Sequence, residues 1–199
     1  TSYGATGEGP NDGATWGGTG IFASKIGGVW DAMLSEGRKW WLFANSDFHG
    51  EGSDFYPGEY QKTIVFVKER TAQGIVDGLR SGNSYIVMGD LIDSLRFTVG
   101  DATMGETFTT SNNKVTIKII VRDPIGKNHN SFSDFNEPEL DHIDLIAGKV
   151  TGLIDPSHPD YTKDEVSTTK VIARFGKTEH TDANGIKTQL WKDLGNGIK

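Results

Sequence analysis

The chain has 199 residues, no cysteine and a formal net charge of −7. This length accommodates one large domain or two small ones, and the absence of cysteine excludes disulfides and thiolate metal sites, so any metal would be held by histidine, carboxylate or carbonyl groups. The acidic balance argues against nucleic acid as a partner, and no apolar segment approaches the roughly 20 residues that span a bilayer.

The chain begins with a glycine-rich stretch that leads into a helical pattern. Residues 1–19 lack an initiator methionine and are rich in glycine and threonine, which predicts a loop and indicates a fragment of a longer protein, or else a processed or engineered start. In residues 21–36 apolar side chains recur at spacings of three and four, which predicts an amphipathic helix interrupted at Gly27 and Gly28. Gly37 follows as the expected helix stop.

An apolar run in residues 40–44 predicts a buried strand, and the sequence turns polar directly after it. Asp47 and His49 follow two positions apart, so in an extended segment both side chains point to the same side. A carboxylate oxygen beside an imidazole nitrogen suits a divalent metal such as zinc, manganese or iron. The alternative is that both residues belong to an ordinary solvated loop, because Asp-x-His alone is a common pattern.

Residues 62–88 continue the alternation of helix and strand. Residues 62–68 form a β-prone, nearly all-apolar run that predicts a buried strand. Thr71 fits an N-cap, and an apolar stripe predicts a short helix that ends at Gly82. Residues 83–88 predict a further strand.

The pattern changes beyond Gly89, where apolar and polar residues alternate as in half-buried antiparallel strands. No helix is expected after residue 90, and His142 is expected to face solvent or to be hydrogen-bonded within a sheet. The sequence therefore predicts a small β-sandwich or an appended sheet. The expected strands cover residues 94–99, 114–121, 140–147, 168–175 and 186–191.

Four stretches together resemble PHP-type (polymerase and histidinol phosphatase) metal-dependent phosphoesterases. The resemblance covers roughly residues 17–90 and includes the closing metal motif of the family and the strand and helix that follow it. The stretches are residues 30–38 (WDAMLSEGR), 45–50 (NSDFHG), 60–67 (YQKTIVFV) and 75–85 (IVDGLRSGNSY).

The resemblance implies a distorted β/α barrel whose rim binds two or three divalent metal ions, with Asp47 and His49 as the last pair of ligands. It also implies hydrolysis of a small-molecule phosphoester by metal-activated water. The opening His-x-His pair of the family is absent, because the first histidine is His49. Two ligands cannot hold a metal cluster. The resemblance therefore describes the C-terminal portion of an enzyme, inactive by itself unless another chain completes its site.

The sequence thus predicts an α+β chain with a C-terminal remnant of a β/α barrel in residues 1–90 and an antiparallel β-sandwich-like domain in residues 91–199. The alternative is a non-catalytic β-sandwich module that binds carbohydrate or protein. Its oligomeric state and compartment stay open. The aromatic residues that would stack on such a ligand are Trp16, Tyr56, Phe132, Phe135, Tyr161 and Trp191.

Overall fold

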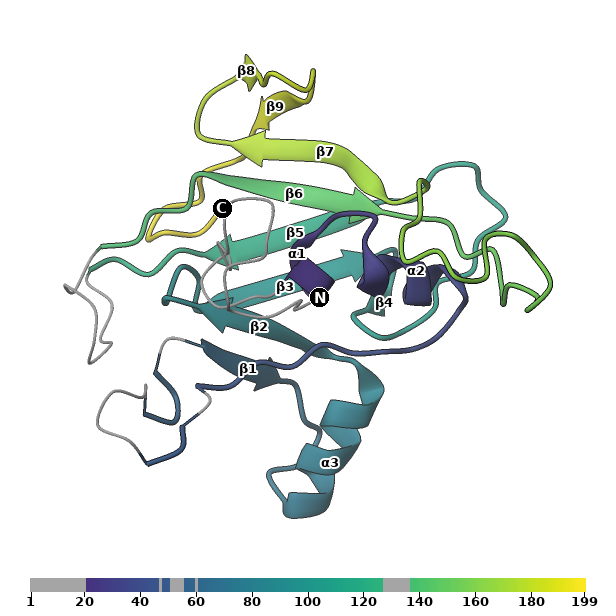
Figure 1. Ribbon diagram of the computed structural model, residues 1–199. Coiled ribbons are helices and arrows are strands. Elements are labelled where there is room, and N and C mark those ends of the chain that lie inside the picture. The colour runs from purple at the N-terminus through teal and green to yellow at the C-terminus, as the bar shows by residue number, and fades with distance from the viewer. Residues whose placement is uncertain (1–20, 47, 51–55, 60, 127–136) are drawn as a thin grey trace. The chain divides into compact units, whose positions relative to one another are not determined.

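The computed structural model describes residues 21–46, 48–50, 56–59, 61–126 and 137–199, and it shows an α+β chain (Figure 1). The described strands are mostly antiparallel and form small sheets, as the sequence predicts. The helices are α1 (Ile21–Ser24), α2 (Val29–Ser35) and α3 (Ala72–Ser81). The strands are β1 (Gln61–Val65), β2 (Ser84–Met88), β3 (Ser94–Val99), β4 (Ala102–Thr103), β5 (Ile117–Arg122), β6 (His142–Ala147), β7 (Lys170–Gly176), β8 (His180–Thr181) and β9 (Lys187–Leu190).

The chain divides into two compact units, each built from two stretches of sequence. The first combines Thr1–Trp40, described from Ile21 onward, with Asp141–Trp191, and the second combines Trp41–Leu140 with Lys192–Lys199. The predicted domains, residues 1–90 and 91–199, stay a prediction.

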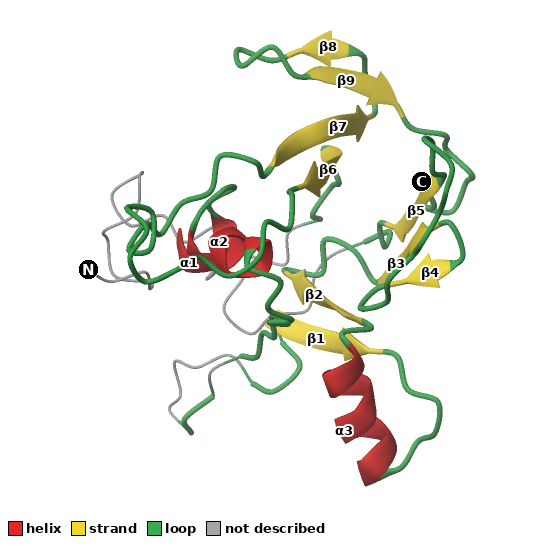
Figure 2. Cartoon of the chain, turned by 90° about the vertical axis from the view of Figure 1, so that its right-hand side faces the viewer, coloured by secondary structure: helices red, strands yellow, loops and turns green. Residues whose placement is uncertain are grey.

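The sheet of the first unit has the strand order β6-β7-β9-β8. Strands β6 and β7 are antiparallel, β7 and β9 are parallel, and β8 pairs with β9 in an antiparallel arrangement (Figure 2). In the same unit the helical region breaks at Gly27, as predicted, because this residue has a φ of +76° and its carbonyl accepts a hydrogen bond from the Val166 N–H. Gly37, with a φ of +84°, ends α2 as expected.

The second unit contains two separate sheets. Strands β1 and β2 pair antiparallel although α3 connects them, whereas consecutive strands of a β/α barrel are parallel. The other sheet has the order β4-β3-β5, and Val121 of β5 exchanges both backbone hydrogen bonds with Lys199 at the C-terminus. Among the described residues of this unit, the buried apolar side chains are Val87, Val121 and Leu140.

Helix α3 agrees with the sequence at both ends. The Thr71 hydroxyl accepts a hydrogen bond from the Gly74 N–H at 3.0 Å, and Gly82 adopts the left-handed conformation with φ of 75°. The side chains of the expected apolar stripe are largely exposed: Ile75 is 50% and Val76 is 38% exposed. The helix packs on β1 through Gly78 instead.

The predicted buried strand in residues 40–44 is wrong. These residues have irregular backbone, and Trp40 and Phe43 are 52% and 49% exposed. Apolar character alone does not make a strand, because a strand also needs a ladder partner, and Ala44 bonds to the Thr63 side chain instead.

The other strand predictions are largely confirmed, with shifts at the ends. The strand expected in residues 62–68 is observed as β1, but it is half-buried rather than buried, and Phe66 is 45% exposed. Residues 94–99 form β3 as predicted, whereas β5 begins at Ile117 rather than at residue 114. The short strands β4 and β8 were not expected. Beyond residue 90 the described residues contain strands and no helix.

None of the helices in the described residues is long and apolar enough to cross a membrane.

Gly78→Ala tests the packing of α3 on β1. A Cβ at this position would lie 2.8 Å from Val65 Cγ1 and 2.9 Å from the Phe66 carbonyl oxygen. We expect a net loss on the order of 1–2 kcal/mol in the free energy of unfolding, because the steric cost exceeds the gain in helix propensity. Urea denaturation measures it. The control Gln73→Ala, on the exposed side of the same helix, should cost no more than about 0.5 kcal/mol. A Gly78→Ala protein as stable as wild type contradicts the proposed contact.

Candidate functional site

The segment that leads to the Asp-x-His motif is anchored in the second unit by side chains at two points. The Ala44 N–H donates to the Thr63 hydroxyl at 2.8 Å, and this hydroxyl donates back to the Ala44 carbonyl oxygen at 2.9 Å. The Trp41 indole N–H donates to the Arg80 carbonyl oxygen at 3.1 Å. Gly82 lies against the Trp41 ring, where a Cβ would be 2.4 Å from Cε2. The segment is therefore fixed between β1 and the C-terminal end of α3.

A hollow of about 560 Å³ lies where this segment meets β1. Asn45 and Ser46 line it from the segment, and Lys62 and Thr63 line it from β1. Lys62 is the one charged side chain among the described residues that line this hollow. The hollow thus combines polar groups with one cation.

The two predicted metal ligands have different outcomes. His49 is exposed on irregular backbone, and Asp47 lies outside the described residues, so their convergence stays a prediction. Their donor types, a carboxylate oxygen and an imidazole nitrogen, fit zinc, manganese or iron. Their number does not fit a complete site, because about four donors are needed and the described part of the chain contains no group of three or more His, Asp or Glu positioned to hold a metal.

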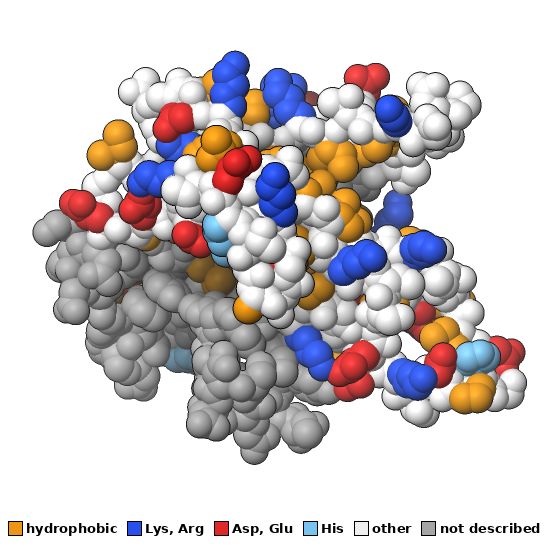
Figure 3. Space-filling view, turned by 90° about the horizontal axis from the view of Figure 1, so that it is seen from above, with side chains coloured by type: hydrophobic (Ala, Val, Ile, Leu, Met, Phe, Trp, Pro, Cys, Tyr) orange, Lys and Arg blue, Asp and Glu red, His pale blue; other side chains and the backbone are white. Residues whose placement is uncertain are grey.

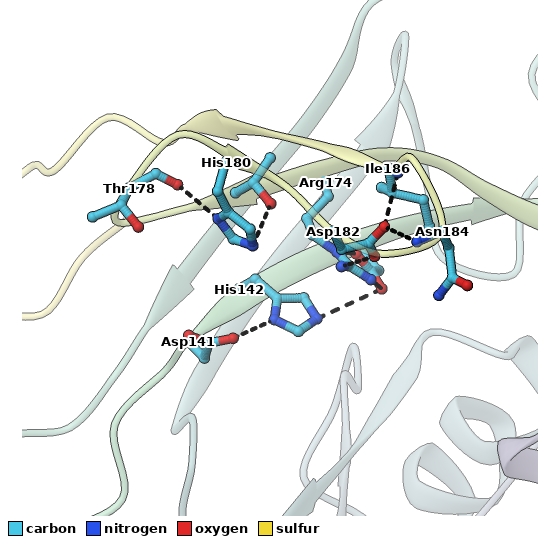
Figure 4. Close-up of polar contacts among 10 residues, drawn as sticks. Asp141, His142, Arg174, Thr178, His180, Asp182, Asn184 and Ile186 are labelled. Carbon is cyan, nitrogen blue, oxygen red and sulfur yellow. Dashed lines mark hydrogen bonds and ion pairs between the residues drawn. The ribbon is translucent and has the colours of Figure 1, made fainter.

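A second polar cluster lies in the first unit, where strand register aligns residues across the sheet (Figure 4). Asp144 of β6 is opposite Arg174 of β7, Arg174 is opposite Thr188 of β9, and Thr188 is opposite His180 of β8. The Thr188 side chain is almost fully buried, and its hydroxyl lies 3.5 Å from His180 Nε2.

Arg174 is the centre of this cluster. Its Nε and Nη2 donate to the two Asp144 carboxylate oxygens at 2.5 and 2.8 Å, and its Nη1 donates to Asp182 Oδ2 at 2.8 Å. Hydrogen bonds from the N–H groups of Ile186 and Asn184, together with Arg174, lower the pKa of Asp182. Arg174 therefore joins β6 and β7 to the turn between β8 and β9.

His142 of β6 is 36% exposed and is hydrogen-bonded to Asp141, the residue directly before the strand, so it combines features of the two alternatives that the sequence left open. Its Nδ1 lies 2.6 Å from Asp141 Oδ2, and its Nε2 lies 3.7 Å from Asp144 Oδ2. The hydrogen bond from His142 lowers the pKa of the Asp141 carboxyl. Because these polar atoms already have protein partners, the cluster serves to hold the sheet together.

Sequence reasoning missed the Arg174 cluster, although one signal for it exists. His142 and Asp144 are two residues apart on a strand, which places them on the same face. Their partners on the neighbouring strands depend on register, which local patterns do not give. On the face shown in Figure 3, cationic and anionic side chains are interspersed among the described residues.

Comparison of the chain with protein-family models, with curated proteins and with solved structures finds no significant match.

Asp182→Asn tests the electrostatic role of the Arg174 cluster. Because the pKa of Asp182 is lower in the folded protein than its ordinary value of 3.8, the carboxylate stabilises the fold above that value and loses this contribution as pH falls through the folded pKa. Asparagine does not titrate. We therefore expect the melting temperature of Asp182→Asn to fall less steeply than that of wild type below about pH 4. Arg174→Met should also make the melting temperature fall less steeply with pH, since it removes one cause of the lowered pKa of Asp182. Equal slopes for wild type and Asp182→Asn in thermal denaturation would disprove this role.

Proposed function

We propose that this chain is the C-terminal portion of a PHP-type metal-dependent phosphoesterase. The observation that carries the proposal is the position of the start of the 45–50 motif, Asn45 and Ser46. It follows directly on a segment anchored to β1 by the Thr63 hydroxyl, beside a hollow that contains Lys62. Polar residues at the end of an apolar segment, next to a cation, suit the binding of a metal and a phosphoester.

The exposure of residues 40–44 supports the barrel part of the proposal. Trp40 and Phe43 are about half exposed, and the Ala44 backbone groups bond to a side chain rather than to a strand. In the proposal, the strands that would pair with this segment in the barrel lie outside the described residues, which would leave its apolar side chains exposed. In this interpretation, the antiparallel β1–β2 pair follows the last barrel strand and is not itself part of the parallel barrel.

Asp47 and His49 would hold a divalent metal, which we take to be zinc, manganese or iron. When bound, such a metal activates a water molecule and neutralises charge on the phosphoryl oxygens. Because two residues supply only half of the donors for one ion, further ligands would come from residues outside the described part of the chain or from other polypeptide. The chain by itself is then inactive, and the β-rich residues 91–199 form an accompanying sandwich-like domain. The substrate is a small-molecule phosphoester, and nucleic acid is not a partner.

The alternative function is a module that binds carbohydrate or protein without catalysis. The rings of Tyr56 and Tyr161, each 53% exposed, favour it because exposed aromatic rings stack on sugars and anchor protein partners. Mutation of His49 would have no effect on such binding.

His49→Ala tests the metal proposal directly on this chain. We expect Mn²⁺ to broaden the NMR signals of the His49 imidazole in the wild-type chain through paramagnetic relaxation, and the neighbouring signals of residues 45–50 to lose their broadening in His49→Ala. His158→Ala, which changes an exposed loop histidine elsewhere, should leave the broadening of residues 45–50 intact. If Mn²⁺ broadens these residues equally with and without His49, the metal assignment is wrong.

The full reading frame that encodes this chain provides the catalytic test. If it supplies the missing ligands, the longer polypeptide should hydrolyse an aryl phosphate in the presence of Mn²⁺, and His49→Ala should lower the rate by more than about 100-fold, because loss of even an outer-shell partner costs 10- to 100-fold. A rate that is unchanged in His49→Ala would contradict the phosphoesterase function and favour the binding module.

A further inference from the structure

Lys62 is the one cationic side chain in the hollow beside residues 44–46, and the described residues that line this hollow include no acidic side chain. Lys62 Nζ donates to the carbonyl oxygen of Gly58, itself a lining residue, at 3.3 Å. The ammonium group therefore lies at the wall of the hollow. Its side chain is 32% exposed, so that it is accessible to a ligand from solvent.

The hydrogen bonds of Lys62 leave room for one more partner. An ammonium group has three N–H donors. One bonds to Asp90 Oδ1 at 2.5 Å and one to the Gly58 carbonyl oxygen. The third has no partner among the described residues and can bind an anion in the hollow, which Asn45 and Ser46 also line.

We infer that Lys62 binds a phosphoryl oxygen of the substrate in this hollow and thereby positions the phosphoester beside the 45–50 motif. The inference rests on the proposed phosphoesterase function, since that function supplies the phosphate. A lysine is a compact point charge that suits phosphate, and its attraction is strongest where it is partly removed from water.

Asp90 controls the strength of this binding. Its carboxylate, 27% exposed, is paired with Lys62 and so competes with an incoming phosphate for the same ammonium group. Asp90 adopts the left-handed conformation with φ of 54°, which asparagine tolerates as well as aspartate. Asp90→Asn therefore removes the competing charge while it preserves the backbone.

Titration of the metal-free chain with inorganic phosphate, followed by backbone NMR shifts of residues 44–46 and 61–63, tests the inference. We expect wild type to show saturable shifts at these residues. Lys62→Met should weaken binding about 10-fold or more, and Lys62→Arg should restore most of it because the charge returns. Asp90→Asn should tighten binding several-fold. Lys68→Met, which changes an exposed lysine outside this hollow, should have no effect.

Two results would overturn the inference: phosphate affinity that is unchanged in Lys62→Met, or affinity that falls in Asp90→Asn. The failure of the proposed function gives a different result. In that case phosphate still binds through Lys62, but Mn²⁺ does not perturb His49. Conversely, Mn²⁺ binding at His49 combined with phosphate shifts that do not depend on Lys62 refutes the role of Lys62 alone.

Discussion

Two side chains anchor the segment that precedes the predicted metal motif, and the Thr63 hydroxyl is the first of them. Thr63 both accepts from the Ala44 N–H and donates to the Ala44 carbonyl oxygen, and so it replaces with a side chain the two hydrogen bonds that a neighbouring strand would supply. Trp41 provides the second anchor through its indole N–H and its contact with Gly82. Because both anchors precede Asn45, the direction in which the chain enters the motif is fixed. Lys62 and Thr63 of β1 line the hollow together with Asn45 and Ser46.

The first unit uses a different principle, in which strand register rather than a single side chain brings polar groups together. Asp144, Arg174, Thr188 and His180 are successive partners across four strands. Arg174 is mostly buried and satisfies two carboxylates at once. A mostly buried cation with two anionic partners has little capacity left for a ligand, and its removal would leave Asp144 and Asp182 without their cationic partner. This cluster stabilises the sheet, and the chemistry that the sequence suggests has to be sought near the 45–50 motif.

The features that could be predicted from the sequence are those determined by a few adjacent residues. The ends of α3 are local, because Thr71 and Gly82 act on their own helix, and the limits of β3 follow from simple alternation. The failures have non-local causes. Residues 40–44 are as apolar as a buried strand, but strand formation requires a partner that the described chain does not place beside them. The parallel pairing of β7 with β9 and the Arg174 cluster likewise depend on register between distant segments. For the candidate site, the sequence indicated the donor types, whereas the position of Lys62 beside residues 44–46 depends on contacts between distant segments.

The binding-module alternative leaves two features unexplained, and one additional β-strand beside residues 40–44 would account for both. The apolar residues Trp40 and Phe43 are exposed on a segment that has no ladder partner among the described residues, and the carboxylate and imidazole of the adjacent motif are too few donors for a complete metal site. A β-strand that paired with residues 40–44 would cover the exposed apolar side chains. In a β/α barrel, the residues at the carboxyl end of such a strand would lie next to the motif and would supply the missing metal donors. A module that binds through exposed tyrosines requires neither. The coincidence of an apolar segment that is unpaired among the described residues with two proposed ligands that need further donors is the physical argument for the proposed phosphoesterase function.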